Sequence, residues 1–295
     1  MKILVTGGAG FLGSTLVDRL LVEEHEVDVV DDLRSGAIAN LASARAEASG
    51  RLKIDQLDVR DSGIAQLIQR RRPEVVFHLA TATDRSGATT DAEAASIDVS
   101  GTVQVLGAAA AAGVAKVVLA GSARADVGAS SRCVTRRFVD QLADHFRAER
   151  GLEYTTVVMP TVYGPRQRSG RESSVVASFL ERLVDGRPCV VHGSGEQTRD
   201  LLYVDDAVDA LVKACHAADG LRVEIGSGRQ TTITSLHRAL AAMLERDGEA
   251  VPGAPRADEP GAVPVDITRA EMYLDWRPFT PLAEGLTDAV VELER

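Results

Sequence analysis

Short runs of β-branched and apolar residues alternate with longer amphipathic stretches, and this alternation constrains the fold more than any other feature. The strand-like runs are KILVTG, EVDVVDD, VVFHLA, KVVLAG and EYTTVVMP, and stretches such as GSTLVDRLLVEE and VQVLGAAAAAGV lie between them. Strands that read as continuous Val, Ile and Leu are buried on both faces, so helices must cover both sides of the sheet. The sequence therefore predicts an α/β fold with a doubly wound parallel sheet, as in Rossmann domains.

A glycine-rich turn follows the first of these runs. In VTGGAGFLGS, Gly7, Gly10 and Gly13 lie between the strand and a helix that begins near Phe11. Glycine permits the tight turn, close approach of the backbone to a pyrophosphate, and close packing of helix on strand, while the helix N-terminus faces the phosphates. A plain glycine-rich turn is the alternative, but the strand before it and the helix after it favour a dinucleotide site.

The second strand-like run ends in two carboxylates, Asp31 and Asp32, about 20 residues beyond the glycines. A carboxylate there accepts hydrogen bonds from the adenosine ribose and repels a 2′-phosphate, so NAD is favoured over NADP. A helix cap or turn acid is the alternative, and it fits Asp32 better than Asp31. Asp58 and Val59, in QLDVRD after the next strand, are placed to meet the adenine edge.

The pattern changes after Pro165 to longer helices and connections rich in proline and glycine, with short strands predicted at CVVHG and RVEIGSG. We therefore expect residues 1–164 to form the NAD-binding domain, with segments near 188–206 and 221–228 returning to it. Residues 165–295 are expected to form mainly a smaller C-terminal lobe. The stretch 256–265, RADEPGAVPV, is predicted to be an exposed loop.

Composition excludes several classes of protein. The 295 residues are 45% hydrophobic, which is enough for a sizeable core, and a net charge of −10 argues against a nucleic-acid or anionic-membrane partner. The start, MKILVTGG, has no apolar stretch of signal-peptide or membrane-span length, so a cytoplasmic location is expected. Three widely spaced cysteines fit neither a disulfide framework nor a zinc site, and no metal is expected. These are Cys133, Cys189 and Cys215.

Motifs along nearly the whole chain resemble those of one enzyme family. They run from TGGAGFLG, VVDDLRSG, LDVRD, FHLATA and VSGTVQVLGAA to TVYGPRQ, HGSGEQTRDLLYVDDAV, EIGSGRQTTITSL and YLDWRPFTPLAEGL. In these motifs and their order, the chain is similar to extended short-chain dehydrogenases/reductases (SDRs) of the NAD-dependent nucleotide-sugar epimerase/dehydratase family. The resemblance implies NAD in the first half, a nucleoside diphosphate sugar in the second, a transient keto-sugar, and a homodimer.

The resemblance also assigns binding residues. Leu79 to Thr81 would line the pyrophosphate on the nicotinamide side, and Tyr163, with Gly164 and Pro165, would shape the wall between cofactor and substrate. Arg199 would face the sugar diphosphate through bidentate bonds, with an ion pair to Asp200 or Asp205 as the alternative. His78 is expected to be structural. The expected cofactor-binding residues are Gly7, Gly10, Phe11, Leu12, Gly13, Asp31, Asp32, Asp58, Val59, Leu79, Ala80, Thr81, Arg137 and Pro160.

The catalytic positions of the family carry different residues here. Members use a Ser or Thr, a Tyr as general acid/base, and a Lys four residues later that lowers the Tyr pKa and holds the nicotinamide ribose. Anchored on KVVLAGS and on the helix before GLEYTTVVMP, the Tyr position falls at Cys133 and the Lys position at Arg137. The Ser/Thr position falls at Ala123, or at Ser122 if the alignment slips by one residue.

The substrate half also departs from the family pattern. The Asn expected before VxGT is Asp98, and the basic residue expected before the late Pro-Gly is Glu259. Arg256 is then the possible substitute in substrate binding.

Three interpretations of the catalytic positions between Ser122 and Arg137 remain open. In the first, Cys133 is the acid/base, because Arg137 would lower its thiol pKa from about 8.5. In the second, Cys133 only fills space, and the proton is carried by another group. In the third, the protein binds NAD but is non-catalytic or performs a redox-neutral step. An enzyme is favoured, because a cofactor and a substrate that meet would explain together the glycine loop, the acidic strand ends and the QTRDLLYVDD segment. The other proton carriers considered are Asp98, Asp126, Arg124, Ser122 and Tyr163.

Overall fold

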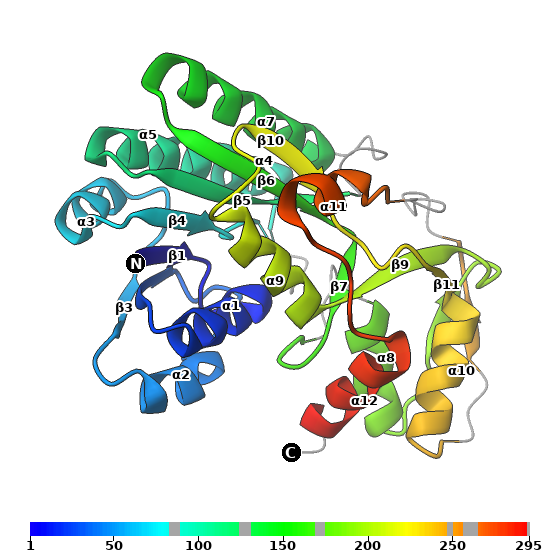
Figure 1. Cartoon of the computed structure of the whole chain (residues 1–295). Coiled ribbons are helices and arrows are strands. Elements are labelled where there is room, and N and C mark those ends of the chain that lie inside the picture. Colours follow the sequence, from blue (N-terminus) through cyan, green and yellow to red (C-terminus); the bar gives the residue numbers. More distant parts are fainter. Residues whose placement is uncertain (83–88, 124–130, 169–174, 247–249, 256–264, 294–295) are drawn as a thin grey trace.

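The computed structural model of the chain describes residues 1–82, 89–123, 131–168, 175–246, 250–255 and 265–293, with the backbone alone at 131 and 132. Seven parallel strands form its central sheet, in the order β10-β6-β5-β4-β1-β2-β3 (Figure 1). This confirms the predicted doubly wound parallel sheet. The strands are β1 (Lys2–Thr6), β2 (Glu26–Asp31), β3 (Leu52–Gln56), β4 (Val75–His78), β5 (Lys116–Ser122), β6 (Glu153–Met159) and β10 (Leu221–Glu224).

Helices cover both faces of this sheet because successive side chains of a strand point to opposite faces. Along β1, Ile3 and Val5 belong to one buried apolar cluster, and Leu4 belongs to another. The first cluster includes side chains of α1 and α9, and the second includes side chains of α3, α5 and α7, which lie on the opposite face (Figure 1). These helices are α1 (Phe11–Val22), α3 (Gly63–Arg71), α5 (Thr102–Ala112), α7 (Ser131–Arg150) and α9 (Val204–Ala214).

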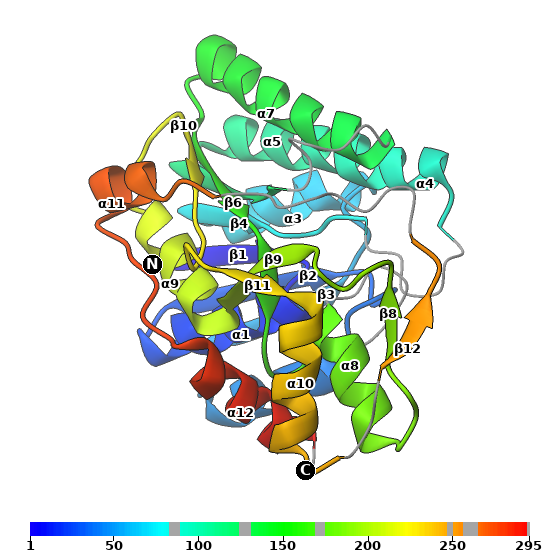
Figure 2. The same ribbon diagram turned by 90° about the vertical axis from the view of Figure 1, so that its right-hand side faces the viewer.

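The second half adds a smaller lobe with two short sheets, and Figure 2 shows its helices α8, α10 and α12 close together. One sheet has the order β11-β9-β7 and the other pairs β12 with β8. The lobe contains β7 (Thr161–Tyr163), α8 (Val175–Val184), β8 (Val190–His192), β9 (Thr198–Tyr203), β11 (Gln230–Thr232), α10 (Ile233–Met243), β12 (Val251–Gly253) and α12 (Leu282–Leu293). Helix α11 (Thr268–Leu274) packs instead against α9 and β10 of the main domain.

One of the two segments predicted to return to the first domain joins the central sheet. Strand β10 pairs in parallel with β6, in the register Leu221↔Thr155. The prediction for 188–206 was wrong as regards this sheet, since its strands β8 and β9 pair with β12, β7 and β11. The physical reason is that the chain leaves the sheet at Pro160, and β7 then provides a separate edge with which β9 pairs.

A buried tryptophan and a buried carboxylate fasten the C-terminal stretch to α9. Trp276 is fully buried, and its indole N–H donates to the Asp206 carbonyl at 3.0 Å. The Asp206 carboxylate accepts hydrogen bonds from the backbone N–H groups of Phe279 and Thr280, each at 3.1 Å. Because α9 also packs against α1, these bonds hold the smaller lobe against the main sheet.

A continuous helical segment, α4 (Asp91–Ala95), η2 (Ser96–Gly101) and α5, crosses one face of the sheet. By length and composition alone, the helical span Asp91–Ala112 is long and apolar enough to cross a membrane. Its buried side chains, among them Val105 and Leu106, join the apolar cluster with α3. A helix that covers a sheet is also apolar, because its side chains are buried in the core. Packing against the sheet therefore explains the apolar composition of this segment.

His78 ends β4 inside the core and is held by hydroxyl groups on both sides. Its Nδ1 lies 2.8 Å from Thr6 Oγ1, and its Nε2 lies 3.0 Å from Thr102 Oγ1. Burial lowers the pKa of His78 from 6.5 to about 4. The ring is therefore neutral at pH 7, as suits a structural histidine.

The low pKa of His78 predicts a loss of stability in acid. The unfolded chain binds a proton near pH 6.5 and the folded chain only near pH 4, so between these values the free energy of unfolding should fall by about 3 kcal/mol because of this residue. We expect His78→Gln to be less stable than the parent at neutral pH, but to lack the part of the acid-induced fall in the free energy of unfolding that comes from His78. Denaturant unfolding across this range measures it, with the exposed His145→Gln as a control that keeps the parent's slope. Equal pH slopes for the parent and His78→Gln would contradict the prediction.

Candidate functional site

A cleft of ≈ 440 Å³ runs along the carboxyl ends of the sheet strands, where ligands of doubly wound proteins bind. Every residue of the expected cofactor-binding set lines it except Arg137. The structure thus brings together residues from the ends of β1, β2, β3, β4 and β6. Their contacts with the cofactor remain a prediction.

The glycine turn after β1 has no room for larger residues. Gly7 has a φ of +72°, which favours glycine, and its N–H donates to the Val30 carbonyl at 2.8 Å. A Cβ at Gly13 would lie 2.1 Å from the Gly7 carbonyl oxygen, so α1 can approach the turn only if this residue is glycine. The turn therefore exposes backbone and the N-terminus of α1 to the cleft, as a pyrophosphate requires.

Asp31 fixes this turn to the end of β2. Its Oδ2 accepts a hydrogen bond from Ala9 N–H at 2.9 Å, and its Oδ1 accepts one from Leu33 N–H at 2.8 Å. Burial raises the pKa of Asp31, while these two donors act to lower it. Asp32 accepts from the backbone N–H of Arg34 at 2.9 Å, so it does serve as a turn acid. Both carboxylates still line the cleft.

The other end of the cleft reaches β5 and α7. Ser122 lines this end, whereas Ala123 is buried, with its N–H bonded to the Met159 carbonyl. Of the two alternatives for the hydroxyl position, Ser122 is thus the one that faces the cleft.

The cation that faces this end is Arg136 rather than Arg137. Arg136 lines the cleft, whereas Arg137 is exposed and lines only a second, smaller cavity; Cys133 lines neither of them. The physical reason is helical phase, because one residue along α7 turns the side chain by about 100°. The Cys133 and Arg137 alignment is therefore one residue out of phase with the face of α7 that meets the cleft.

The smaller cavity, of ≈ 30 Å³, adjoins the cleft and has room for about two water molecules. The two cavities share Thr81, Ala120, Gly121, Ser122 and Arg136. Asp98 lines the smaller one from the π-helical turn η2. Its side chain is 3% exposed and accepts a hydrogen bond from Ala82 N–H at 2.7 Å, which ties the helix to the loop after β4.

Two of the three expected substrate-binding residues, Tyr163 and Arg199, line neither cavity. Tyr163 is buried against Tyr203, and its hydroxyl donates to the Leu282 carbonyl at 3.3 Å, so its place is in the core. Arg199 donates to the Thr198 carbonyl at 2.7 Å, whereas its proposed partner Asp200 accepts bonds from Ser227 and Gly228. Arg256, with Glu259, Arg124 and Asp126, lies outside the described residues.

The sequence analysis missed several residues that line the cleft. Arg34 lies two residues beyond Asp32 in DDLRSG, and 166–168 follow directly after the YGP motif, so proximity to a recognised motif was the available signal. Asn40, in contrast, lies nine residues beyond Asp31, and its side chain donates to the Ala9 carbonyl at 2.8 Å. The missed residues are Val30, Arg34, Ser35, Asn40, Leu57, Ala82, Ile97, Ala120, Gly121, Arg136, Met159, Val162, Arg166, Gln167 and Arg168.

Comparison with known proteins agrees with this geometry. Residues 3–226 match the NAD dependent epimerase/dehydratase family. The chain belongs to this family. It is 37% identical, over 98% of its length and 97% of the relative's, to a UDP-glucose 4-epimerase of Mycolicibacterium smegmatis. Family members use NAD, and this chain's cofactor is NAD, which the glycine turn and the Asp31 carboxylate fit.

Solved structures of the family have the same fold as this chain. The UDP-glucose 4-epimerase of Thermotoga maritima, solved with UDP-glucose, aligns with a TM-score of 0.93 at 32% identity, covering 100% of this chain and 99% of the other. The UDP-glucose 4-epimerase of Thermus thermophilus, solved with NAD, aligns with a TM-score of 0.91 at 26% identity, with the same coverage.

The crowding at Gly13 predicts the effect of one added methyl group. We expect Gly13→Ala to lower NAD affinity by at least about tenfold and to destabilise the protein by roughly 1–3 kcal/mol, because the Gly7 carbonyl must move. Calorimetric NAD titration and thermal unfolding measure the two effects. The control is Gly107→Ala in α5, where the nearest atom would be 3.9 Å away and unchanged NAD affinity is expected. Parent-like NAD affinity in Gly13→Ala would refute this account of the turn.

Proposed function

We propose that this chain is a nucleotide-sugar epimerase or dehydratase that acts through a transient keto-sugar at an atypical catalytic centre. The observation that carries the proposal is the continuous cleft from the glycine turn to Ser122, where Val162 and residues 166–168 of the adjoining segment also line it. Its volume of ≈ 440 Å³ lies within the range of small-molecule sites. UDP-sugars are the first substrates to test, because the relatives at 37% and 32% identity are UDP-glucose 4-epimerases.

We assign the catalytic centre to Ser122 and Arg136. NAD, when bound, supplies a reversible acceptor for a hydride from a sugar carbon. The Ser122 hydroxyl can accept a hydrogen bond from the reacting sugar hydroxyl or donate one to the carbonyl that replaces it. The Arg136 guanidinium can stabilise negative charge on that oxygen or bond the ribose hydroxyls, but it cannot relay a proton. Within the described residues, no hydrogen bond or ion pair engages Arg136.

The proton acceptor is the open part of this centre. Ser122 and Asp98 both border the smaller cavity, which has room for a bridging water, so they are the candidates that the geometry favours. Cys133 is the acid/base expected from the sequence, and it stays a candidate to be tested although it does not line the cavities.

One observation favours the second function, an NAD-binding protein that is non-catalytic or performs a redox-neutral step. Among the described residues, the cleft lining includes no tyrosine, lysine or cysteine. Those side chains would ordinarily carry the proton in a hydride cycle of this kind. A nucleotide sugar would then bind beside NAD without oxidation.

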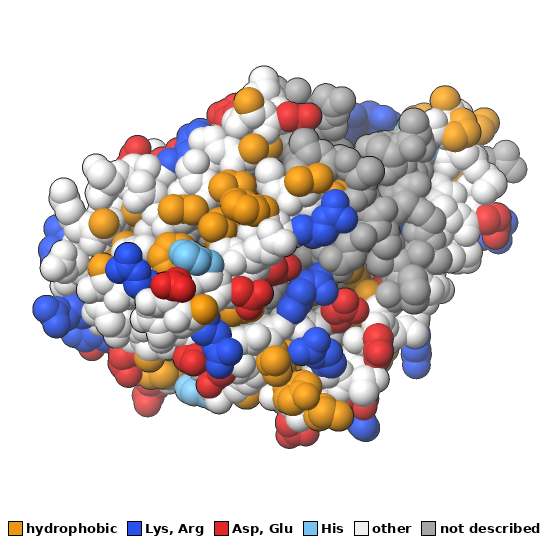
Figure 3. Space-filling view, turned by 90° about the horizontal axis from the view of Figure 1, so that it is seen from above, with side chains coloured by type: hydrophobic (Ala, Val, Ile, Leu, Met, Phe, Trp, Pro, Cys, Tyr) orange, Lys and Arg blue, Asp and Glu red, His pale blue; other side chains and the backbone are white. Residues whose placement is uncertain are grey.

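The remaining expectations belong to the same proposal. Arg199 and Arg256 are retained as candidates for the sugar diphosphate, in a cytoplasmic enzyme without a metal. The proposed homodimer has exposed apolar side chains available on α5 and α7, namely Val103, Val134 and Phe138. Figure 3 looks onto this side of the molecule and shows apolar patches between the charged side chains.

Turnover of UDP-sugars tests the proposed function. We expect protein loaded with NAD to convert UDP-glucose, UDP-galactose or UDP-glucuronic acid, with transient NADH absorbance and a product detectable by chromatography. NADH formation accompanies oxidation of a sugar carbon and is absent from a redox-neutral step. NAD-loaded protein that binds these sugars but forms neither product nor NADH would favour the second function.

Substitutions along α7 test the assignment of the centre. We expect Arg136→Ala to lower kcat by about 10²-fold, the scale of losing one charge-stabilising donor, and Arg136→Lys to recover part of it. Cys133→Ala and Arg137→Ala should retain kcat within about twofold, because neither side chain lines the cleft. Steady-state kinetics at saturating sugar measures these effects. A large loss in Cys133→Ala with a parent-like Arg136→Ala would restore the assignment made from sequence.

A further inference from the structure

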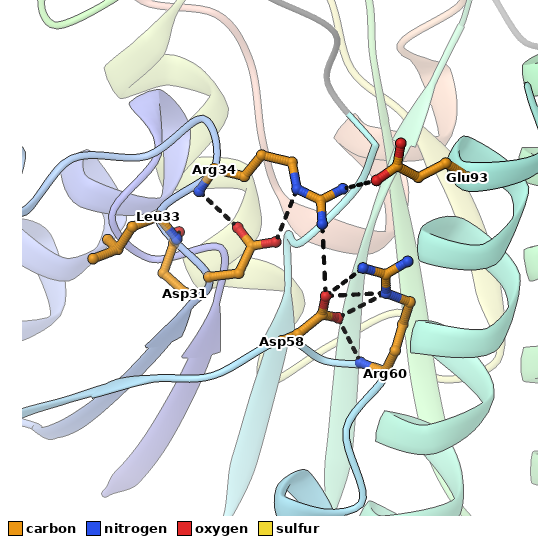
Figure 4. Close-up of polar contacts among 7 residues, drawn as sticks. Asp31, Leu33, Arg34, Asp58, Arg60 and Glu93 are labelled. Atoms are coloured by element: carbon orange, nitrogen blue, oxygen red, sulfur yellow. Dashed lines mark hydrogen bonds and ion pairs between the residues drawn. The ribbon is translucent and has the colours of Figure 1, made fainter. Parts of the chain in front are cut away.

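Arg34 bridges three carboxylates at the adenosine end of the cleft (Figure 4). Its Nη1 lies 2.6 Å from Glu93 Oε1, its Nε lies 3.6 Å from Asp32 Oδ2, and its Nη2 lies 3.9 Å from Asp58 Oδ2. The shortest contact joins segments 59 residues apart, the loop after β2 and the helix α4. This bridge therefore crosses between two separate parts of the fold.

The bridge lies at the edge of the cleft. Arg34, Asp32 and Asp58 line the cleft, whereas Glu93 does not. The side chains of Arg34 and Glu93 are each 39% exposed, so water reaches the pair and it can open without unfolding the chain. Glu93 is therefore linked to the cleft through its contact with Arg34.

Asp58 is the carboxylate of the bridge that is held in place by another residue. The Nε of Arg60 donates to the two carboxylate oxygens of Asp58, at 2.9 Å and 3.0 Å. These hydrogen bonds hold the pKa of Asp58 below its ordinary value, so the carboxylate stays ionised at neutral pH. Arg34 then faces a carboxylate on either side, Asp58 and Glu93, and is attracted to both.

We propose that Arg34 and Glu93 form a latch over the adenosine end of the NAD cleft, which must open before NAD can leave. This proposal rests on the NAD binding of the family and not on the proposed turnover of sugars. Exposed ion pairs contribute little to stability, so the latch acts on the rate of cofactor exchange. Slow exchange serves a reaction in which the same cofactor must accept a hydride and later return it.

The dissociation rate of NADH tests the latch without any sugar. Full-length protein loaded with NADH is mixed rapidly with excess NAD, and the loss of protein-bound NADH fluorescence gives the rate. We expect Glu93→Gln and Arg34→Ala each to raise this rate by roughly two- to fivefold, the range that exposed ion pairs supply. The double variant should release NADH no faster than Arg34→Ala alone, because both changes break one contact.

Salt and matched charge changes supply the controls. Added salt should speed NADH release from the parent more than from Glu93→Gln, because it screens the exposed pair. Arg45→Ala in α2 (Ala42–Glu47) and Glu149→Gln in α7 remove the same charges at exposed positions outside the cleft, and parent-like rates are expected. Thermal unfolding verifies that each variant is folded.

Two results would overturn the latch. One is a parent-like rate and salt dependence in Glu93→Gln, and this result alone decides the matter if Arg34→Ala does not fold. If Glu93→Gln is parent-like and Arg34→Ala folds but releases NADH faster, Arg34 contacts the cofactor without help from Glu93, and the latch is refuted as well. The other is a further rise when Glu93→Gln is added to Arg34→Ala, since independent effects would then add.

Discussion

The contact between Gly13 and the Gly7 carbonyl is the constraint on which the rest of the site depends. A Cβ at Gly13 would lie 2.1 Å from that oxygen, so a side chain there would push α1 away from β1. The position of α1 sets where its N-terminus meets the cleft, and Asp31 locks the same turn to β2 through Ala9. One small residue thus aligns the helix dipole, the backbone N–H groups and the acidic strand end toward a single ligand.

The two ends of the cleft differ in whether their arginines are paired with carboxylates of the chain. At the adenosine end, Arg34 and Arg60 are paired with carboxylates before any ligand arrives. At the opposite end, Arg136 has no partner among the described residues. A guanidinium without a partner gains more from a ligand oxygen than a paired one, because it gives up no existing bond. This difference supports the proposals that the Arg34 end retains the cofactor and that the β5 end meets a reacting oxygen.

The π-helical turn η2 connects these two ends. Asp98 uses the widened turn to reach the backbone of Ala82, and Glu93, one turn earlier on α4, reaches Arg34. Turns of this kind interrupt a regular helix and are often found at functional sites. Neither carboxylate lines the cleft itself, but Glu93 contacts Arg34 at one end of it and Asp98 borders the smaller cavity at the other. A shift of the segment from α4 to η2 would therefore affect both ends.

The sequence by itself determined the parallel sheet, the glycine turn and the acidic strand ends. Each depends on residues close together in the chain: apolar runs specify buried strands, and glycine spacing specifies the turn. The sequence also pointed to Ser122 and to an arginine in the first half of α7, but it selected Arg137, whereas Arg136 is the one that lines the cleft. The tertiary structure alone decided which residues of α7 face the cleft, because the connection between β5 and α7 leaves the helical phase open and one residue changes it by about 100°. It alone brought Glu93 to Arg34 and buried Tyr163 in the core, since these contacts join distant segments that no local pattern relates.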